Sequence, residues 1–85
     1  MDKLRTLLIR HEGLRTHPYE DSVGVLSVGV GRNLDSRGLS MEEVHFLLDN
    51  DIQISIEELS RTFEWFDMLN EPRRDALTSM HFNMG

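Results

Sequence analysis

The fold is indicated by two neighbouring stretches, Glu12-Gly-Leu-Arg-Thr-His-Pro-Tyr-Glu-Asp21 and Gly24-Val-Leu-Ser-Val-Gly-Val-Gly31. The first has the residues expected where a helix ends and is followed by a strand and a turn. Before Glu12, leucines fall at helical spacing, and Gly13 stands where a left-handed glycine commonly ends a helix. After Asp21, apolar and small residues alternate with the period of two that marks a strand. We therefore expect a helix from Asp2 to Glu12, followed by a small antiparallel hairpin or three-stranded ribbon between residues 16 and 31.

These elements should each have two unlike faces. The helix gathers its apolar side at Leu4, Leu7, Leu8 and His11, and Asp2 is able to cap its start. In the ribbon, alternation puts Leu26, Val28 and Val30 on one face and Ser27 and Gly29 on the other. A strand face with so few bulky side chains is expected where another molecule approaches the backbone.

The rest of the chain is predicted to be helical. Ser40-Met-Glu-Glu43 has the spacing of a capping box, so a long helix should begin at Met41 and end near Arg61. Apolar residues recur along this stretch every three or four positions, at Met41, Val44, Leu48, Ile52, Ile56, Leu59 and Phe63. A helical turn is expected at residues 65–69. A last helix should follow an Asn70 cap, with Pro72 in its first turn and Gly85 at its C-cap.

The last helix has more apolar surface than its neighbours in the sequence are able to cover. Its apolar residues wrap most of the circumference, as in helices that are buried on several sides: Ala76, Leu77, Met80, Phe82 and Met84. We therefore expect either self-association or a second chain that covers this helix, because the surface would otherwise stay exposed.

Length and charge limit the possible functions. The 85 residues suffice for one domain, and the absence of cysteine excludes disulfides and thiolate metal sites. The net charge is −6, with five acidic and six basic residues in 1–39 against ten acidic and three basic residues in 40–75. No basic face for nucleic acid is evident, and no apolar run is long enough for stable membrane insertion or a secretory signal. The four histidines share no metal-ligand spacing, so neither a metal nor a cofactor is expected.

Two carboxylates on differently built elements suggest acid and base chemistry. Glu12 closes a helix, where the negative end of the dipole favours the protonated carboxylic acid that a general acid needs. Asp21 lies in a turn and should stay ionised, so that it activates water or stabilises positive charge at an anomeric carbon. The plainer interpretations are an exposed glutamate at a helix end and an aspartate that bonds its own turn backbone. Both interpretations of Asp21 can hold together.

The same residues carry a family resemblance. Ile9-Arg-His-Glu-Gly-Leu14, Tyr19-Glu-Asp21 and Leu26-Ser-Val-Gly-Val-Gly-Arg-Asn-Leu34 resemble the active-site region of phage-type lysozymes, glycoside hydrolase family 24. Asn70-Glu-Pro-Arg-Arg-Asp-Ala-Leu77 and His81-Phe-Asn-Met-Gly85 resemble a later helical stretch of that family. The resemblance implies one α+β, lysozyme-like domain over residues 1–85 that lacks the usual C-terminal helices. Its parts would be a β active-site lobe (14–39), a connecting helix (40–63) and a partial helical lobe (64–85).

The resemblance also assigns roles to individual residues. It implies that Glu12 and Asp21 are catalytic and that Ser27, where the family generally has threonine, positions the attacking water. Serine keeps the hydroxyl but loses the methyl group that fixes its rotamer. Gly29 and Gly31 would form the floor under a sugar ring. The substrate-binding residues implied by the resemblance are Gly29, Gly31, Leu34, Phe82 and Asn83.

The implied activity is hydrolysis of the β-1,4 bond between N-acetylmuramic acid and N-acetylglucosamine in peptidoglycan. The setting would be phage lysis of a bacterium, with the protein released from the host cytoplasm by a separate holin-like factor. Two other hypotheses remain. One is an inactive lysozyme-like remnant that binds glycan or another protein. The other is a small acidic interaction protein that uses the face of its long helix.

Overall fold

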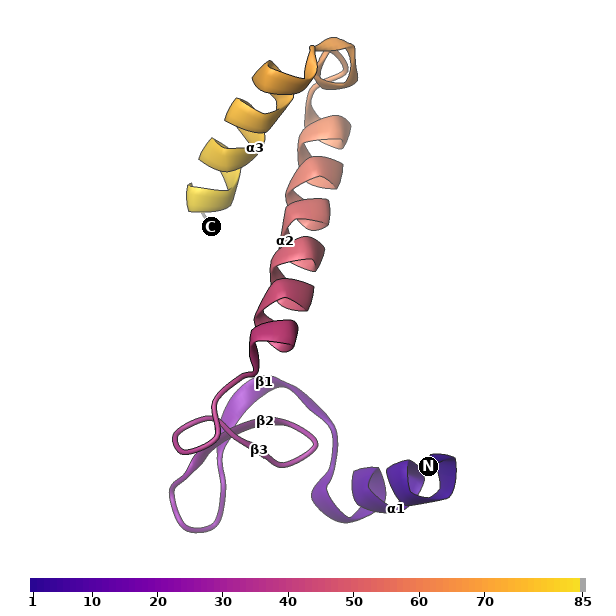
Figure 1. The fold of residues 1–85 in the computed structure, drawn as a ribbon, viewed down its shortest axis with the longest axis vertical. Coiled ribbons are helices and arrows are strands. Elements are labelled where there is room, and N and C mark those ends of the chain that lie inside the picture. Colours follow the sequence, from indigo (N-terminus) through magenta and orange to yellow (C-terminus); the bar gives the residue numbers. More distant parts are fainter. Residues whose placement is uncertain (85) are drawn as a thin grey trace. The chain divides into compact units, whose positions relative to one another are not determined.

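The computed structural model describes residues 1–84, which contain three α-helices, one 3-10 helix and a three-stranded sheet (Figure 1). The predicted α+β class is therefore confirmed. The chain divides into two compact units, Met1–Ser40 with the sheet and Met41–Gly85 with the two longer helices. The finer prediction of one domain with parts at 14–39, 40–63 and 64–85 stays a prediction.

Helix α1 runs from Asp2 to Glu12, as predicted, but its two ends differ from expectation. Asp2 is not the cap, because it is already the first helical residue, and Met1 holds the N-cap position without a side-chain hydrogen bond. At the other end, Gly13 has the expected positive φ of 78° and its N–H donates to Ile9 O at 2.8 Å. Its ψ of 169° is extended instead of left-handed helical, so the chain passes directly into the first strand.

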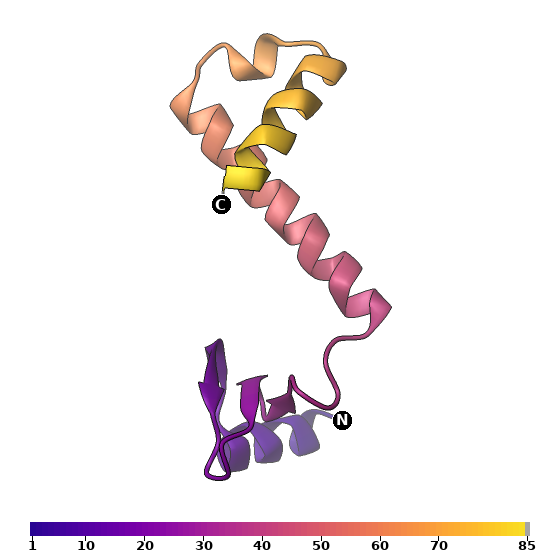
Figure 2. The same cartoon turned by 90° about the vertical axis from the view of Figure 1, so that its left-hand side faces the viewer.

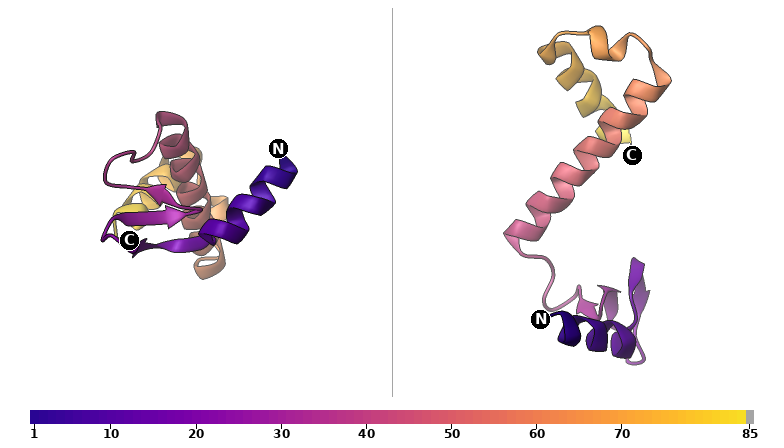
Figure 3. Two further views of the ribbon diagram at one scale, coloured as in Figure 1. Left: turned by 90° about the horizontal axis from the view of Figure 1, so that it is seen from below. Right: turned by 90° about the vertical axis from the view of Figure 1, so that its right-hand side faces the viewer.

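The apolar side of α1 is not covered within its own unit. Leu4, Leu7 and Leu8 are 45–55% exposed, and none of the helix's residues, all of which are described, is buried. Only the carboxyl-terminal end of the helix comes close to the strands, while its amino-terminal end extends away from them (Figure 3, left). This geometry leaves the last turn, with Glu12, as the part of α1 that meets the sheet.

Strands β1 (Arg15–Glu20), β2 (Leu26–Gly29) and β3 (Arg32–Asn33) form an antiparallel sheet in the order β1-β2-β3. The predicted ribbon is confirmed in its three-stranded form, although β3 begins just beyond its expected end. Tyr19 lies opposite Ser27 and Arg15 lies opposite Gly29, with an irregularity in β1 between these pairs. On the other side of β2, Ser27 lies opposite Asn33.

In β2, Ser27 is more deeply buried than the apolar residues of the opposite face. Ser27 is only 4% exposed, whereas Leu26 and Val30 are 39% and 37% exposed. Ser27 lies in the central strand, where its directly opposite neighbours Tyr19 and Asn33 share its face and crowd it from both sides. The face of Leu26 has no second layer within this small unit. The serine, and not the leucine, is therefore the buried residue of the sheet.

The second unit consists of α2 (Met41–Thr62), a 3-10 helix η1 (Phe66–Met68) and α3 (Glu71–Met84), which returns beside α2 (Figure 2). These elements match the predicted long helix, helical turn and last helix. Among the described residues, the buried apolar side chains are Leu59 and Phe66, at 6% and 1% exposure. Ser60 Oγ donates to Asp67 Oδ2 at 2.7 Å and so joins η1 to the end of α2.

Short-range contacts define where the helices of this unit end and begin. Beyond the end of α2, the rings of Phe63 and Trp65 stack with their centroids 4.9 Å apart. Asn70 caps α3 as predicted, because its Oδ1 accepts the N–H of Arg73 at 3.1 Å, and Pro72 lies in the first turn. The predicted cap at Gly85 falls outside the described residues.

Most of the apolar surface of α3 is exposed, because α2 covers only one side of it. Met80 is 62%, Phe82 40% and Met84 86% exposed, and Thr78 is the buried residue of the helix. The Thr78 hydroxyl donates to Arg74 O at 2.7 Å, which satisfies it inside the helix. The expectation of burial on several sides is thus not met within the described residues, and cover by a second chain stays a prediction.

Candidate active site

Glu12 lies against the turn that joins β2 to β3. A Cβ atom at position 31 would lie 2.9 Å from Glu12 Oε2 and 3.3 Å from its Cδ, so a side chain there would displace this carboxylate from its position. Gly31 also has a φ of 67°, a backbone conformation that residues with a Cβ rarely adopt. The Glu12 residue itself is exposed. The Glu12 carboxyl group therefore lies close to backbone while remaining open to solvent.

Asp21 forms the turn between β1 and β2. Its Oδ1 accepts hydrogen bonds from the backbone N–H groups of Val23 and Val25, both at 2.9 Å. Main-chain bonds support the same turn, since Asp21 N–H donates to Val25 O and Gly24 N–H donates to Asp21 O, at 2.9 and 3.0 Å. The structural interpretation of Asp21 is therefore confirmed. Among the described residues nothing bonds its Oδ2, and the exposed carboxylate keeps that oxygen for another partner.

Besides Gly31, three of the predicted site residues lie in or just after β2 and β3. Ser27 is buried, and its hydroxyl donates to Val25 O across a long 3.5 Å. Gly29 is different, because a Cβ there would meet nothing within 4 Å, so the surface above its backbone is open. Leu34 is half-buried, and its N–H donates to Leu26 O at 2.8 Å, which closes the β2–β3 turn.

Strand topology sets the order of these groups along the sheet. Glu20, which precedes Asp21, pairs with Leu26 at the start of β2, and Gly31 follows Gly29 at the end of β2. Asp21 and Glu12 therefore lie toward opposite ends of a four-residue strand, with Ser27 and the open Gly29 between them. Such a strand measures about 10 Å from its first to its last Cα atom.

Phe82 and Asn83 belong to α3 in the second unit, whereas Glu12 belongs to the first. Phe82 lines two neighbouring hollows of its own unit. One, of about 360 Å³, is lined also by Asp51, Ile54, Ser55, Glu58 and His81. The other, of about 310 Å³, is mainly apolar and includes Leu48, Ile52 and Ile56. Phe82 therefore lines one hollow that has several polar residues and one that is mainly apolar.

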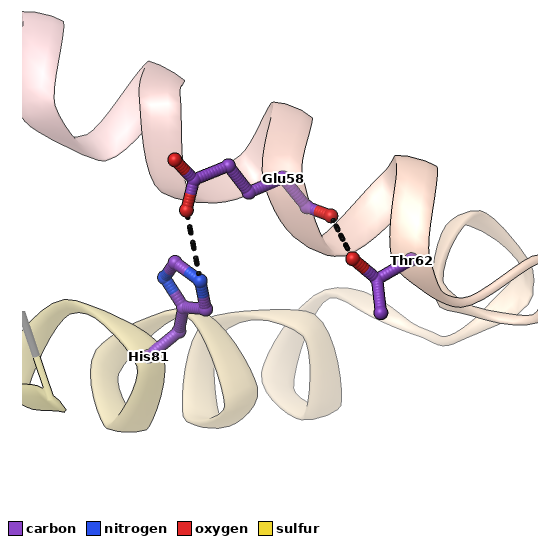
Figure 4. Close-up of polar contacts among 3 residues, drawn as sticks. All are labelled: Glu58, Thr62 and His81. Atoms are coloured by element: carbon purple, nitrogen blue, oxygen red, sulfur yellow. Dashed lines mark hydrogen bonds and ion pairs between the residues drawn. The ribbon is translucent and has the colours of Figure 1, made fainter.

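A polar pair in the first hollow was missed by the sequence reasoning. His81 Nε2 of α3 lies 3.1 Å from Glu58 Oε2 of α2, while Thr62 Oγ1 donates to Glu58 O at 2.7 Å (Figure 4). Both partners lie on helices whose pairing creates the contact, so no local spacing in the sequence could have indicated it. His81 Nδ1 is buried and has no hydrogen-bond partner among the described residues.

Residues 1–84 bring no three His, Cys, Asp or Glu side chains together in a way that would hold a metal ion. None of the described helices is both long enough and apolar enough to cross a bilayer.

Comparison with known proteins gives one clear match. The model of the phage lysozyme family matches residues 9–85, which contain all the predicted site residues. A comparison with curated proteins found no match. The family match covers far more than half of the chain and is consistent with the α+β architecture. This chain therefore belongs to the phage lysozyme family.

Proposed function

We propose that the protein is a muramidase that hydrolyses the β-1,4 bond between N-acetylmuramic acid and N-acetylglucosamine in peptidoglycan. The observation that carries this proposal is the position of Glu12, whose exposed carboxyl group lies against the Gly31 backbone, 2.9 Å from where a Cβ atom would stand. Catalytic groups gain from being in position before the substrate arrives. The family match supports the general class of activity.

The two carboxyl groups take unlike roles in the proposed reaction. Glu12, as the protonated acid, gives its proton to the glycosidic oxygen as the bond to the anomeric carbon breaks. Asp21 accepts a proton from the water whose oxygen forms the new bond to that carbon. An inverting reaction of this kind needs carboxyl groups about 6.5–9.5 Å apart, and a retaining one needs about 5–5.5 Å. Placement at opposite ends of β2 favours the inverting course.

Ser27 has a supporting role in this scheme. Its bond to Val25 O, at 3.5 Å, is at the outer limit of hydrogen bonding, so the hydroxyl is free to exchange it for a water near Asp21. However, Ser27 is only 4% exposed, so little of its surface is accessible to water. That burial favours a second candidate function, a family member that binds glycan without cleaving it.

A peptidoglycan zymogram with matched variants tests the proposal. The wild-type chain should clear the gel and Glu12→Gln should not, while Glu20→Gln, which removes an exposed neighbouring carboxylate, should clear it normally. Clearing by Glu12→Gln, or its absence in wild type, would refute the muramidase proposal. If wild type only sediments with cell walls, the non-catalytic glycan binder is supported.

Asp21 needs two substitutions, because it also holds a turn. Asp21→Asn retains an oxygen that accepts the N–H groups of Val23 and Val25, so its stability should match wild type while its activity is lost. Asp21→Ala removes both bonds and should lose about 1–2 kcal/mol of stability as well. An active Asp21→Asn would show that the residue serves only the turn.

Release into the cell wall by a holin-like factor is part of the same proposal.

A further inference from the structure

Arg15 and Tyr19 form a contact on β1 that the proposed chemistry does not use. The guanidinium carbon of Arg15 lies 4.5 Å from the centroid of the Tyr19 ring, within the range of a cation–π interaction. Arg15 is exposed and Tyr19 is half-buried. Across residues 1–84, the guanidinium makes no ion pair and no hydrogen bond. The positive charge thus lies against an aromatic ring and has no anionic partner among the described residues.

Strand register puts this charge beside the candidate active site. Directly opposite residues of an antiparallel pair share a face, so Tyr19 shares the face of Ser27, and Arg15 that of Gly29. The backbone of Gly29 is open above, with nothing within 4 Å of a Cβ position. Arg15 also follows Glu12 by three residues, and Glu12 lies against Gly31. A molecule resting over Gly29 would lie between the carboxyl group and the guanidinium.

The chemistry of the guanidinium defines what it would bind. Arginine presents five N–H donors in a planar fork that matches the two oxygens of a carboxylate. Contact with the Tyr19 ring restricts the side chain without using the N–H groups in hydrogen bonds, so less conformational entropy is lost when an anion binds. An arginine arranged in this way is suited to a carboxylate carried on a sugar.

We propose that Arg15, positioned by Tyr19, binds a carboxylate attached to the muramyl residue and so distinguishes peptidoglycan from uncharged N-acetylglucosamine polymers. This inference rests on the proposed function. Two carboxylate sources share the chemistry, namely the lactyl group of a peptide-free muramyl sugar and the acidic residues of its peptide stem. The two are separable, because the lactyl carboxylate is free only when the stem has been removed.

Binding measurements with three probes test the inference and identify the source. The probes are a chitotetraose without carboxylates, the alternating muramyl tetrasaccharide without peptide, and the same tetrasaccharide with its stems. Calorimetric titration into wild type should give tighter binding for at least one carboxylate probe than for chitotetraose. Arg15→Gln should weaken that preferred probe about tenfold and leave chitotetraose unchanged, because only a charge-assisted contact is lost.

Two further variants make the result specific. Arg5→Gln removes an equal charge from the exposed surface of α1 and should leave all three affinities unchanged. Tyr19→Leu should give a smaller loss, confined to the same carboxylate probe as Arg15→Gln. Equal weakening of all probes by Arg15→Gln, equal weakening by Arg5→Gln, or a wild type without preference for carboxylates would each overturn the inference.

These experiments test the Arg15 inference and the muramidase proposal separately. Arg15-dependent binding of a muramyl probe by a chain that does not cleave peptidoglycan would sink the muramidase proposal and retain the inference. Normal cleavage with Arg15-independent binding would do the reverse. Where the chain is active, Arg15→Gln should raise KM for peptidoglycan about tenfold with little change in kcat, as expected when ground-state and transition-state binding are lost equally.

Discussion

At the scale of single residues, the Glu12 carboxylate and the Gly31 backbone occupy adjoining space that a methyl group would fill. Gly31→Ala should therefore push the carboxylate away from its position. Because the displaced atoms are the flexible end of a side chain, the cost to stability should come mostly from the positive φ, about 1–2 kcal/mol. The cost to activity should be larger, about 100-fold, because catalysis is sensitive to shifts of about 1 Å.

Gly38→Ala is the matched control for this substitution. Gly38 has a φ of 61°, and the nearest atom to a Cβ there would be Leu34 O at 3.9 Å, so the variant bears similar backbone strain without touching Glu12. Urea unfolding should give similar stability losses for the two variants, while turbidity assays on cell walls should show an activity loss only for Gly31→Ala. Equal activity losses would mean that the contact with Glu12 has no catalytic importance.

The same scale shows where sequence reasoning stops. Asp21 was predicted in both of its roles, and its turn role is now confirmed by two bonds to Oδ1, because aspartate–turn chemistry is local. The Glu12–Gly31 contact was not predicted, although glycines alternating along a strand gave a signal that something approaches the backbone. Which side chain does so depends on how a helix end meets a turn nineteen residues later in the chain.

At the scale of secondary-structure elements, the stability of α3 depends strongly on the cap at its first turn. Much of its apolar surface is exposed, so packing contributes less to its stability. Asn70→Ala removes the acceptor for the N–H of Arg73 and should destabilise the protein by about 1 kcal/mol. Asn50→Ala, in the exposed middle of α2, should be neutral or slightly stabilising, since alanine favours helix interiors. Thermal melts followed by circular dichroism compare the two. A greater loss for Asn50→Ala would contradict the assigned cap.

Helices were predicted more accurately than faces of the sheet. Periodicity located α1 and α2 to within a residue, because a stripe of leucines or isoleucines recurs over several turns. The two faces of β2 were predicted, but not which of them is buried. Alternation identifies two faces but not which one is covered, and in a central strand the neighbours of Ser27 supply the cover.

At the scale of the whole molecule, few side chains are buried, so each one matters more. Phe66 is 1% exposed and joins η1 to the core of the second unit. Phe66→Ala should cost about 3–5 kcal/mol, which approaches the total stability of many small domains. We expect loss of the cooperative melt, measured by circular dichroism and by calorimetry.

Phe46→Ala provides the comparison, since Phe46 is 74% exposed on α2. Its unfolding free energy should stay within about 0.5 kcal/mol of wild type, as is usual for surface positions. Similar effects of the two substitutions would show that the second unit is not organised around Phe66. The importance of Phe66 could not have been read from the sequence, where Trp65 and Phe63 beside it look equally apolar.

The stacked pair of Phe63 and Trp65 has a practical consequence. Trp65 is the sole tryptophan of the chain and Tyr19 its sole tyrosine, and each lies in a different compact unit. Selective excitation of the indole therefore reports on unfolding around the end of α2, while the phenol signal reports on the sheet. Energy transfer between these two natural chromophores gives a label-free ruler for the separation of the units in solution.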